Sequence, residues 1–325
     1  MSDKTALVTG ATGLLGRQVV RAFGRKQWAV KGTGYSRADG SQILKVDLGN
    51  ASEIEKVLDE VKSQVVVHCA ANRFPDKCDA DPAGARALNA AATASLASQC
   101  AARSALLVYI STDYVFAGRP GEAPYETDAE PAPTNLYGIT KLEGERAVLA
   151  AYESAGKQGL GVVLRVPVLY GDAEVPAESA VNVLLDVVWK AQGSAEGDQK
   201  IKMDHWSLRY PTNTEDVGRV CCDIAEKYLS TPGDSRSSLP RILQFSSEDR
   251  YTKYEICKVL AEIMGLSTAG IEPTGDPGTP SAGSGGVQRP YDTHLSTRAL
   301  RELGISVATQ DFVGWWRWNV RAFRK

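Results

Sequence analysis

Hydrophobic and polar positions alternate in blocks along the first half of the chain. Mostly apolar runs stand near residues 5–10, 28–34, 41–48, 63–70, 105–111 and 161–171. Segments of helical period that are rich in Ala and Leu separate several of these runs, and Pro82 to Ala102 is one example. Continuous apolar runs are typical of parallel strands that are buried on both faces. The pattern therefore predicts an α/β fold built on a doubly wound parallel sheet.

The alternation loosens after Gly171, where polar segments interrupt it. Residues 193–200 predict a surface loop, and residues 273–290, the segment richest in Gly, Pro and Ser, predict a mobile loop. The remaining pattern predicts two helices and one strand, near residues 214–229, 252–264 and 241–246 respectively. These elements are expected to form a smaller α/β lobe across the carboxyl edge of the sheet, where such folds bind ligands.

This pattern predicts a division of the chain into three parts. We expect residues 1–171 to form the first domain. Residues 172–308 are expected to form mainly the smaller lobe, with some segments that return to the first domain. Residues 309–325 are expected to be a separate aromatic and basic tail.

Composition and charge narrow the function classes. The 325 residues are 43% hydrophobic and 23% charged, which is ordinary for a globular protein. A formal net charge of −2 excludes the overall basic field that draws proteins to nucleic acid or acidic lipid. No charged-then-apolar leader and no run of about 18 apolar residues occurs, so we expect neither an export signal nor a membrane span.

Cysteine and histidine usage adds two expectations. The six cysteines show no CxxC spacing, which predicts reduced thiols in a cytoplasmic protein. None of the three histidines stands at metal-ligand spacing to a cysteine or carboxylate cluster, so we expect no metal site. His68 lies in an apolar run and is expected in the core, whereas Glu143 and Glu145 are expected to be solvated charges on a helix.

Three glycines between the first predicted strand and the first helix indicate a phosphate-binding loop. Gly10, Gly13 and Gly16 follow GxxGxxG spacing. Without side chains in the way, backbone N–H groups and the helix dipole can face a pyrophosphate. A plain tight turn is the alternative for the spacing alone, but the order strand, loop, helix favours a dinucleotide site.

The residues about 20 positions further on select the dinucleotide. A carboxylate there binds a free ribose 2′-hydroxyl and repels a 2′-phosphate. This chain has Ser36 and Arg37 at that place, which favour NADP(H) over NAD(H), and Arg17 at the start of the helix is a second cation. Asp39 leaves the alternative open, because a later end of the second strand moves its carboxylate into the selecting position.

A catalytic set is indicated at the carboxyl end of the fifth predicted strand. The hydroxyls of Ser111 and Thr112 close that strand, and Tyr137 and Lys141 lie four residues apart at the start of the next long helix. A lysine ammonium in this arrangement lowers the pKa of the phenol and binds a ribose hydroxyl, while the phenol passes a proton to a carbonyl oxygen. The YxxxK spacing alone is common. The catalytic set is therefore indicated by the position of Tyr137 and Lys141 after a strand that ends in two hydroxyl residues.

Several motifs together resemble the extended short-chain dehydrogenase/reductase family, a Rossmann fold, in the branch that contains dTDP-4-dehydrorhamnose reductase. These motifs are GATGLLG, HCAA, STDYVF, NLYGITK and RVPVLYG. The resemblance implies that Thr112, Tyr137 and Lys141 form the catalytic set, with Tyr137 as the acid/base. It also implies a set of NADP-binding residues, which comprises Gly10, Thr12, Gly13, Leu14, Leu15, Gly16, Ser36, Arg37, Asp47, Leu48, Ala70, Ala71, Asn89, Tyr137, Lys141, Pro167 and Val168.

Narrower motifs resemble the regulatory β subunits of methionine adenosyltransferase within that branch. They are MDHWSLRYPTNTEDV at residues 203–217, TKYEI at 252–256 and QRP at 288–290. This resemblance implies an NADP-binding protein that associates with the catalytic subunit and modulates S-adenosylmethionine synthesis. The alternative is an active NADPH-dependent reductase of a 4-keto nucleotide sugar, and the Tyr/Lys pair does not decide between them, because the lysine binds ribose in both.

The C-terminal segment WWRWNVRAFRK, residues 315–325, holds half of the six tryptophans and no acidic residue. The β-subunit family inserts its tail into a groove of the catalytic partner. The resemblance therefore implies a partner-binding set that comprises Trp315, Trp316, Trp318, Arg321 and Phe323. The alternative is a last helix whose tryptophans close the second lobe.

Overall fold

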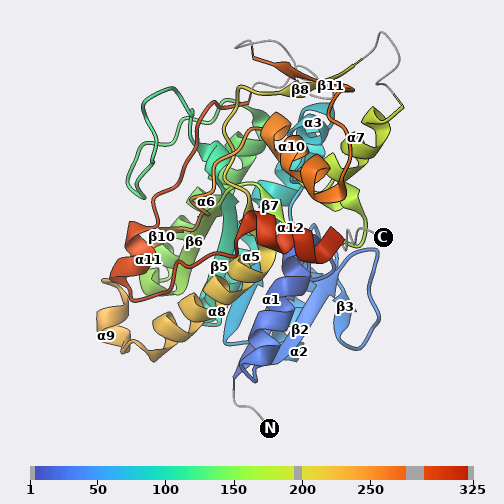
Figure 1. Ribbon diagram of the computed structural model, residues 1–325. Helices are drawn as coiled ribbons and strands as arrows, with labels where there is room; N and C mark the ends of the chain where they lie inside the picture. The colour runs from blue at the N-terminus through green and yellow to red at the C-terminus, as the bar shows by residue number, and fades with distance from the viewer. Residues whose placement is uncertain (1–3, 194–199, 276–288, 321–325) are drawn as a thin grey trace.

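Figure 1 shows the computed structural model of the chain, which describes residues 4–193, 200–275 and 289–320. The loops predicted at residues 193–200 and 273–290 lie largely outside the described residues, as do Arg321 and Phe323 of the predicted partner-binding set. The chain runs from a parallel sheet at its N-terminal end to a smaller group of helices and short strands beyond the sheet's carboxyl edge (Figure 1).

The sheet has seven parallel strands in the order β10-β6-β5-β4-β1-β2-β3. The strands are β1 (Thr5–Thr9), β2 (Ala29–Gly34), β3 (Ile43–Lys45), β4 (Val65–His68), β5 (Leu106–Thr112), β6 (Gly161–Val166) and β10 (Ile242–Gln244). Every residue of β4, β5 and β6 is buried, as the continuous apolar runs predict. The prediction of a doubly wound α/β fold is confirmed, and its strand order reverses between β1 and β4.

Helices cover both faces of this sheet. One face carries α1 (Leu14–Arg25) and α8 (Thr214–Ser230), and the other carries α2 (Ala51–Val61), α5 (Ala92–Ala102) and α6 (Leu136–Ser154) (Figure 1). Shorter helical segments are α3 (Pro75–Ala80), α4 (Pro82–Arg86), η1 (Ala87–Ala91), η2 (Asp113–Val115), η3 (Gln158–Leu160), η4 (Pro176–Glu178), α9 (Gly233–Arg236) and α11 (Arg298–Glu302).

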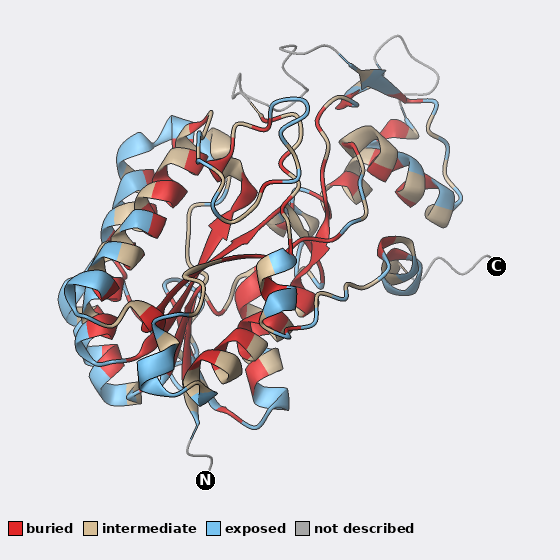
Figure 2. Cartoon of the chain, turned by 90° about the vertical axis from the view of Figure 1, so that its left-hand side faces the viewer, coloured by how far each residue is buried: buried red, intermediate tan, exposed pale blue. Residues whose placement is uncertain are grey.

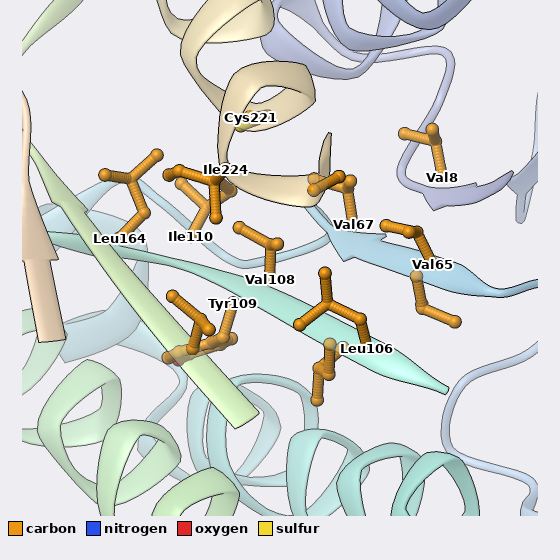
Figure 3. Close-up of a cluster of buried hydrophobic side chains, with 14 of the residues drawn as sticks. Val8, Val65, Val67, Leu106, Val108, Tyr109, Ile110, Leu164, Cys221 and Ile224 are labelled. Atoms are coloured by element: carbon orange, nitrogen blue, oxygen red, sulfur yellow. The ribbon is translucent and has the colours of Figure 1, made fainter. Parts of the chain in front are cut away.

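Helix α8 lies in the second half of the sequence but packs on α1 and the central strands of the sheet. The side chain of Asn213 caps its first turn by accepting a hydrogen bond from the amide of Glu215. A Cβ atom at Gly218 would lie 2.8 Å from the carbonyl oxygen of Gln18, so the glycine allows α8 to approach α1 closely. Figure 3 shows Cys221 and Ile224 of α8 over the apolar side chains of the central strands.

A second hydrophobic core lies beyond the sheet. It joins α7 (Leu184–Ala191), α10 (Lys253–Met264) and α12 (Phe312–Val320) to the short strands β7 (Leu169–Tyr170), β8 (Ile201–Asp204) and β11 (Ile271–Thr274). Strand β9 (Thr212–Asn213) pairs with β7. Helix α10 begins with a capping box between Thr252 and Glu255, and it is followed by Gly265, the C-cap residue, which has a φ of +66°. Figure 2 shows buried residues on the inner faces of these elements as well as along the sheet.

The expectation that Glu145 is a solvated charge is wrong. Glu145 is 1% exposed and forms a bidentate ion pair with Arg165, at 2.7 and 2.9 Å. Its Oε1 also accepts a hydrogen bond from the Ser111 hydroxyl at 2.5 Å. The Glu145–Arg165 pair links α6 to β6, and the hydrogen bond from Ser111 joins β5 to the same pair. Ser111 therefore stabilises the packing of α6 on the sheet. Glu143, two residues earlier, does pair with Arg86 at the surface.

Candidate functional site

The glycine loop of residues 10–16 joins β1 to α1 at the carboxyl edge of the sheet. Gly10 has a φ of +63°, and a Cβ atom there would lie 2.9 Å from the backbone of Ala70. A Cβ atom at Gly16 would lie 2.1 Å from the carbonyl oxygen of Gly10. Both positions therefore need glycine for a tight strand-to-helix turn. A Cβ atom at Gly13 meets only the Gly10 oxygen, at 3.3 Å, so the outer side of the loop is open.

The N-terminus of α1 fits the phosphates of a dinucleotide. Gly13 is the N-cap residue, no side chain caps it, and the first turn has no acidic residue. Several N–H groups at a helix N-terminus lack intrahelical partners and carry the positive end of the dipole. Leu14 and Leu15 are buried behind the turn and anchor it. The loop therefore offers an uncapped, electropositive turn of the kind that binds pyrophosphate.

The loop after β2 favours Ser36 and Arg37 as the selecting residues. Strand β2 ends at Gly34, so Ser36 and Arg37 follow it directly and are exposed. Arg37 Nη2 donates to the carbonyl oxygen of Thr12 at 2.8 Å, which holds the guanidinium beside the glycine loop. The carboxylate of Asp39 instead accepts hydrogen bonds from the amides of residues 41, 42 and 43. Those hydrogen bonds lower the pKa of Asp39 and engage its carboxylate in its own turn.

Other residues of the predicted dinucleotide set also lie at the carboxyl edge. Asp47 and Leu48 follow β3, and Asp47 Oδ1 accepts a hydrogen bond from the amide of Gly49 at 2.8 Å. Ala70 and Ala71 follow β4 and are half-buried, with Ala70 against Gly10. Pro167 and Val168 follow β6, whose last residue pairs with Thr112 in the sheet register. The sheet thus places these segments along one edge.

Asn89 fixes the loop after β4 from within the protein. It is fully buried in the π-helical segment η1, and its amide group binds the backbone of Asn72 through two hydrogen bonds of 2.8 and 2.9 Å. Asn89 Nδ2 also donates to the Thr140 hydroxyl at 3.1 Å. The structure therefore shows Asn89 positioning this loop against α6. A π-helical turn often occurs at functional sites.

The structure brings Thr112, Tyr137 and Lys141 together at the end of β5. Tyr137 lies in the first turn of α6, and its ring is edge-on to that of Tyr114, two residues after Thr112, with centroids 6.1 Å apart. The Lys141 ammonium is buried, donates to the carbonyl oxygen of Ile110 at 2.6 Å and lies 4.0 Å from the ring centroid of Tyr109. The set is therefore assembled by the strand end and the first turns of α6.

Burial controls the charge states of this set. Desolvation lowers the pKa of Lys141 to about 7, although the nearby Glu145 carboxylate opposes the shift. Desolvation raises the pKa of Tyr137. Tyr137 therefore keeps its proton at neutral pH, and the expectation that the Lys141 ammonium lowers the pKa of this phenol is wrong, because burial sets the direction of the shift. A protonated phenol at this position can donate a proton to a carbonyl oxygen.

Asp113 is a buried group of the site to which the sequence analysis gave no role. Its carboxylate accepts hydrogen bonds from Thr293 at 2.6 Å and from Thr112 at 3.0 Å, and desolvation raises its pKa to about 6. Thr293 is 180 positions away in sequence, and it ties a late segment of the chain to the site. The motif STDYVF contains Asp113, but only the fold reveals its partner.

The predicted tail is in part a helix packed on the second core. Trp316 is 2% exposed and stacks near Tyr170, with ring centroids 5.9 Å apart. Trp315 is half-buried, with its ring centroid 5.1 Å from that of Tyr170, whereas Trp318 is 83% exposed. Trp316 thus packs into the second core, as the alternative interpretation of the segment has it, whereas Trp318 is exposed to solvent.

The described residues contain neither a membrane-spanning helix nor a cluster of metal-ligating side chains. Within residues 4–193, 200–275 and 289–320, no helix is both long and apolar enough to cross a membrane. The same residues contain no group of three or more His, Cys, Asp or Glu side chains that could hold a metal ion. All six cysteines are free thiols, and His68 is buried between the Thr9 and Thr93 hydroxyls.

Comparison with known proteins identifies the family. The RmlD substrate binding domain family matches residues 4–319. Methionine adenosyltransferase 2 subunit beta of Xenopus tropicalis is 40% identical over 311 residues, which cover 96% of this chain and 86% of that protein. The chain belongs to this β-subunit family. The narrower resemblance of the sequence motifs is thereby confirmed.

Reductases of the same branch are less similar in sequence to this chain than the β subunit of Xenopus tropicalis is. The dTDP-4-dehydrorhamnose reductase of Mycolicibacterium smegmatis is 30% identical over 302 residues, covering 92% of this chain and 80% of the reductase. The dTDP-4-dehydrorhamnose reductase of Bacillus anthracis, solved in complex with NADP, is 21% identical with a TM-score of 0.76, and 99% of each chain is covered. The second likeness establishes a shared fold.

Proposed function

We propose that this chain is a regulatory β subunit of methionine adenosyltransferase that binds NADP and modulates S-adenosylmethionine synthesis through the catalytic subunit. The observation that carries the proposal is the 40% identity to a named β subunit over 96% of the chain. The absence of CxxC pairs and the six free thiols support a cytoplasmic location. In this proposal, residues 1–171 bind the dinucleotide and the second core presents the C-terminal segment.

Association with the catalytic subunit is the direct test. Immobilised β subunit should retain purified methionine adenosyltransferase catalytic subunit, and its addition should change the kcat or KM of S-adenosylmethionine synthesis. A reductase fold with no such role should do neither. Absence of both retention and a kinetic effect at micromolar concentrations of the two proteins would contradict the proposal.

The glycine loop, Arg37 and Lys141 support NADP as the dinucleotide. The uncapped turn at Gly13 suits the pyrophosphate, Arg37 suits the 2′-phosphate, and Lys141 suits a ribose hydroxyl. The nicotinamide of the bound group would supply hydride chemistry if a substrate were present. Arg37 is exposed, and its hydrogen bond to the carbonyl oxygen of Thr12 holds its guanidinium beside the loop, where it also pairs with Glu174.

Arg37→Glu should weaken NADP binding by about 10- to 100-fold, because the substitution replaces a charge-assisted contact with repulsion. NAD lacks the 2′-phosphate, so its affinity should change by less than about threefold. Fluorescence or calorimetric titration of both dinucleotides measures the difference. Arg21→Glu is the matched control, since Arg21 is an exposed arginine of α1 that pairs with Asp172. Equal losses for the two dinucleotides would remove Arg37 from the selecting role.

An NADPH-dependent reductase of a 4-keto nucleotide sugar is the second candidate, because Thr112, Tyr137 and Lys141 lie together at the end of β5, where Thr112 and Lys141 are buried and Tyr137 is half-buried. In that reaction Tyr137, kept protonated by its raised pKa, would donate a proton to the carbonyl oxygen.

Tyr137→Phe should leave the melting temperature and the NADP affinity within about threefold of wild type, because it removes one hydroxyl only. If the wild type oxidises NADPH with dTDP-4-dehydrorhamnose and Tyr137→Phe abolishes this turnover, the chain is a reductase. If the wild type shows no such oxidation, the regulatory proposal stands alone.

A further inference from the structure

An acidic strap, residues 172–178, crosses the glycine loop and pairs with its arginines. Glu178 Oε2 accepts a hydrogen bond from Arg17 Nη2 at 2.6 Å, and Glu174 Oε2 accepts one from Arg37 Nη1 at 2.5 Å. Weaker cross-pairs of 3.4 Å join Arg17 to Glu174 and Arg37 to Glu178. The strap is therefore connected to both cations that flank the glycine loop.

The same arginines are fixed on the loop itself. The carbonyl oxygen of Thr12 accepts hydrogen bonds from Arg17 Nη1 at 2.7 Å and from Arg37 Nη2 at 2.8 Å. Arg73, in the loop after β4, donates to the backbone oxygen of Glu178. The strap thus bridges the segments after β1, β2 and β4. These are the segments whose carboxyl ends face a dinucleotide in folds of this class.

The two carboxylates of the strap differ in burial. Glu178 and Arg17 have side chains that are only 11% and 15% exposed, and Glu178 Oε2 also accepts the amide of Glu174 at 3.0 Å. Glu174 and Arg37 have side chains that are 55% and 49% exposed. Exposed ion pairs are weak, so the Glu174–Arg37 pair exchanges readily with another anion. The Glu178–Arg17 pair instead holds the strap in place.

We infer that Glu174 is a specificity-determining residue of the dinucleotide site, because its carboxylate occupies the guanidinium that a 2′-phosphate would need. The inference rests on the proposed function, in which the chain binds NADP. A 2′-phosphate must displace the Glu174 carboxylate from Arg37. The displaced carboxylate stays nearby, so its negative charge also repels the phosphate. NAD carries no group for Arg37, so Glu174 lowers the affinity for NADP and leaves that for NAD nearly unchanged. Glu174 thereby reduces the preference for NADP over NAD that Arg37 creates.

Glu174→Gln tests the inference by titration of NADP and NAD with the full-length chain. We expect NADP to bind about three- to tenfold more tightly to Glu174→Gln than to the wild type, and NAD affinity to change by less than twofold. Asp172→Asn is the matched control, because it removes one negative charge from the same strap, whereas its side chain pairs with Arg21. It should leave the ratio of the two affinities within twofold of wild type.

Amide hydrogen exchange of the strap gives a second readout. Saturating NADP should raise exchange within residues 172–178 of the wild type more than saturating NAD does, because only NADP displaces Glu174. An unchanged NADP affinity in Glu174→Gln, equal gains for both dinucleotides, or an equal gain in Asp172→Asn would overturn the inference while the dinucleotide site stands. A wild-type chain that binds neither dinucleotide would overturn both.

Discussion

Trp316→Ala is expected to lower the free energy of unfolding by about 3–5 kcal/mol, the range typical of a fully buried tryptophan. Its ring packs in the second core among Tyr170, Phe312 and Trp315, at centroid distances of 4.9 to 6.2 Å. Alanine would leave a cavity that these aromatic rings fill only in part. Urea unfolding followed by circular dichroism measures the loss, and a change below about 1 kcal/mol would contradict the packing role.

Trp318→Ala is the matched control and separates packing from partner binding. Trp318 is 83% exposed on the same helix, so its substitution should change stability by less than about 0.5 kcal/mol. If the C-terminal segment binds the catalytic subunit, an exposed tryptophan is a typical hot spot, and affinity should fall by about 30-fold or more. A stable Trp318→Ala chain with unchanged affinity would remove this helix from the interface.

The fold was predictable because the apolar runs and the helical segments between them reflect which residues are buried in the sheet. Each strand of the sheet lies within a predicted run, and the helices predicted at residues 214–229 and 252–264 are observed at Thr214–Ser230 and Lys253–Met264. Local capping chemistry sets these ends, so a short window of sequence contains the signal. The glycine loop and the Tyr137/Lys141 pair were predictable for the same reason, since their geometry depends on neighbours within a few residues.

The unpredicted parts of the site depend on contacts between distant residues. Arg17 and Glu178 are 161 positions apart, and Asp113 and Thr293 are 180 apart. No spacing rule joins such residues, because only the folded sheet brings their segments together. The face of the C-terminal helix that meets the second core was unpredictable for a related reason: the alternation of tryptophan and arginine does not tell which tryptophan packs inward. Trp316 faces that core and Trp318 does not.

The buried ion pair between Glu145 and Arg165 carries the other large expected effect. Both side chains are 2% exposed, and the Arg165 guanidinium also lies 5.0 Å from the ring centroid of Phe116. Glu145→Ala should lower the free energy of unfolding by about 3–5 kcal/mol, because it leaves Arg165 charged and buried without a counterion. Denaturant unfolding of the purified variant measures this loss.

Glu143→Ala is the control, because Glu143 stands two positions away on the same helix and pairs with Arg86 at the surface, at 3.5 Å. Its substitution should change stability by less than about 0.5 kcal/mol. The double variant Glu145→Leu with Arg165→Met should recover most of the loss, since well-packed apolar residues often replace a buried ion pair without cost. If Glu145→Ala is as stable as Glu143→Ala, water reaches the Arg165 guanidinium, and its charge is not left buried without compensation. If the double variant is as unstable as Glu145→Ala, packing against Phe116, and not the unpaired charge, accounts for the loss.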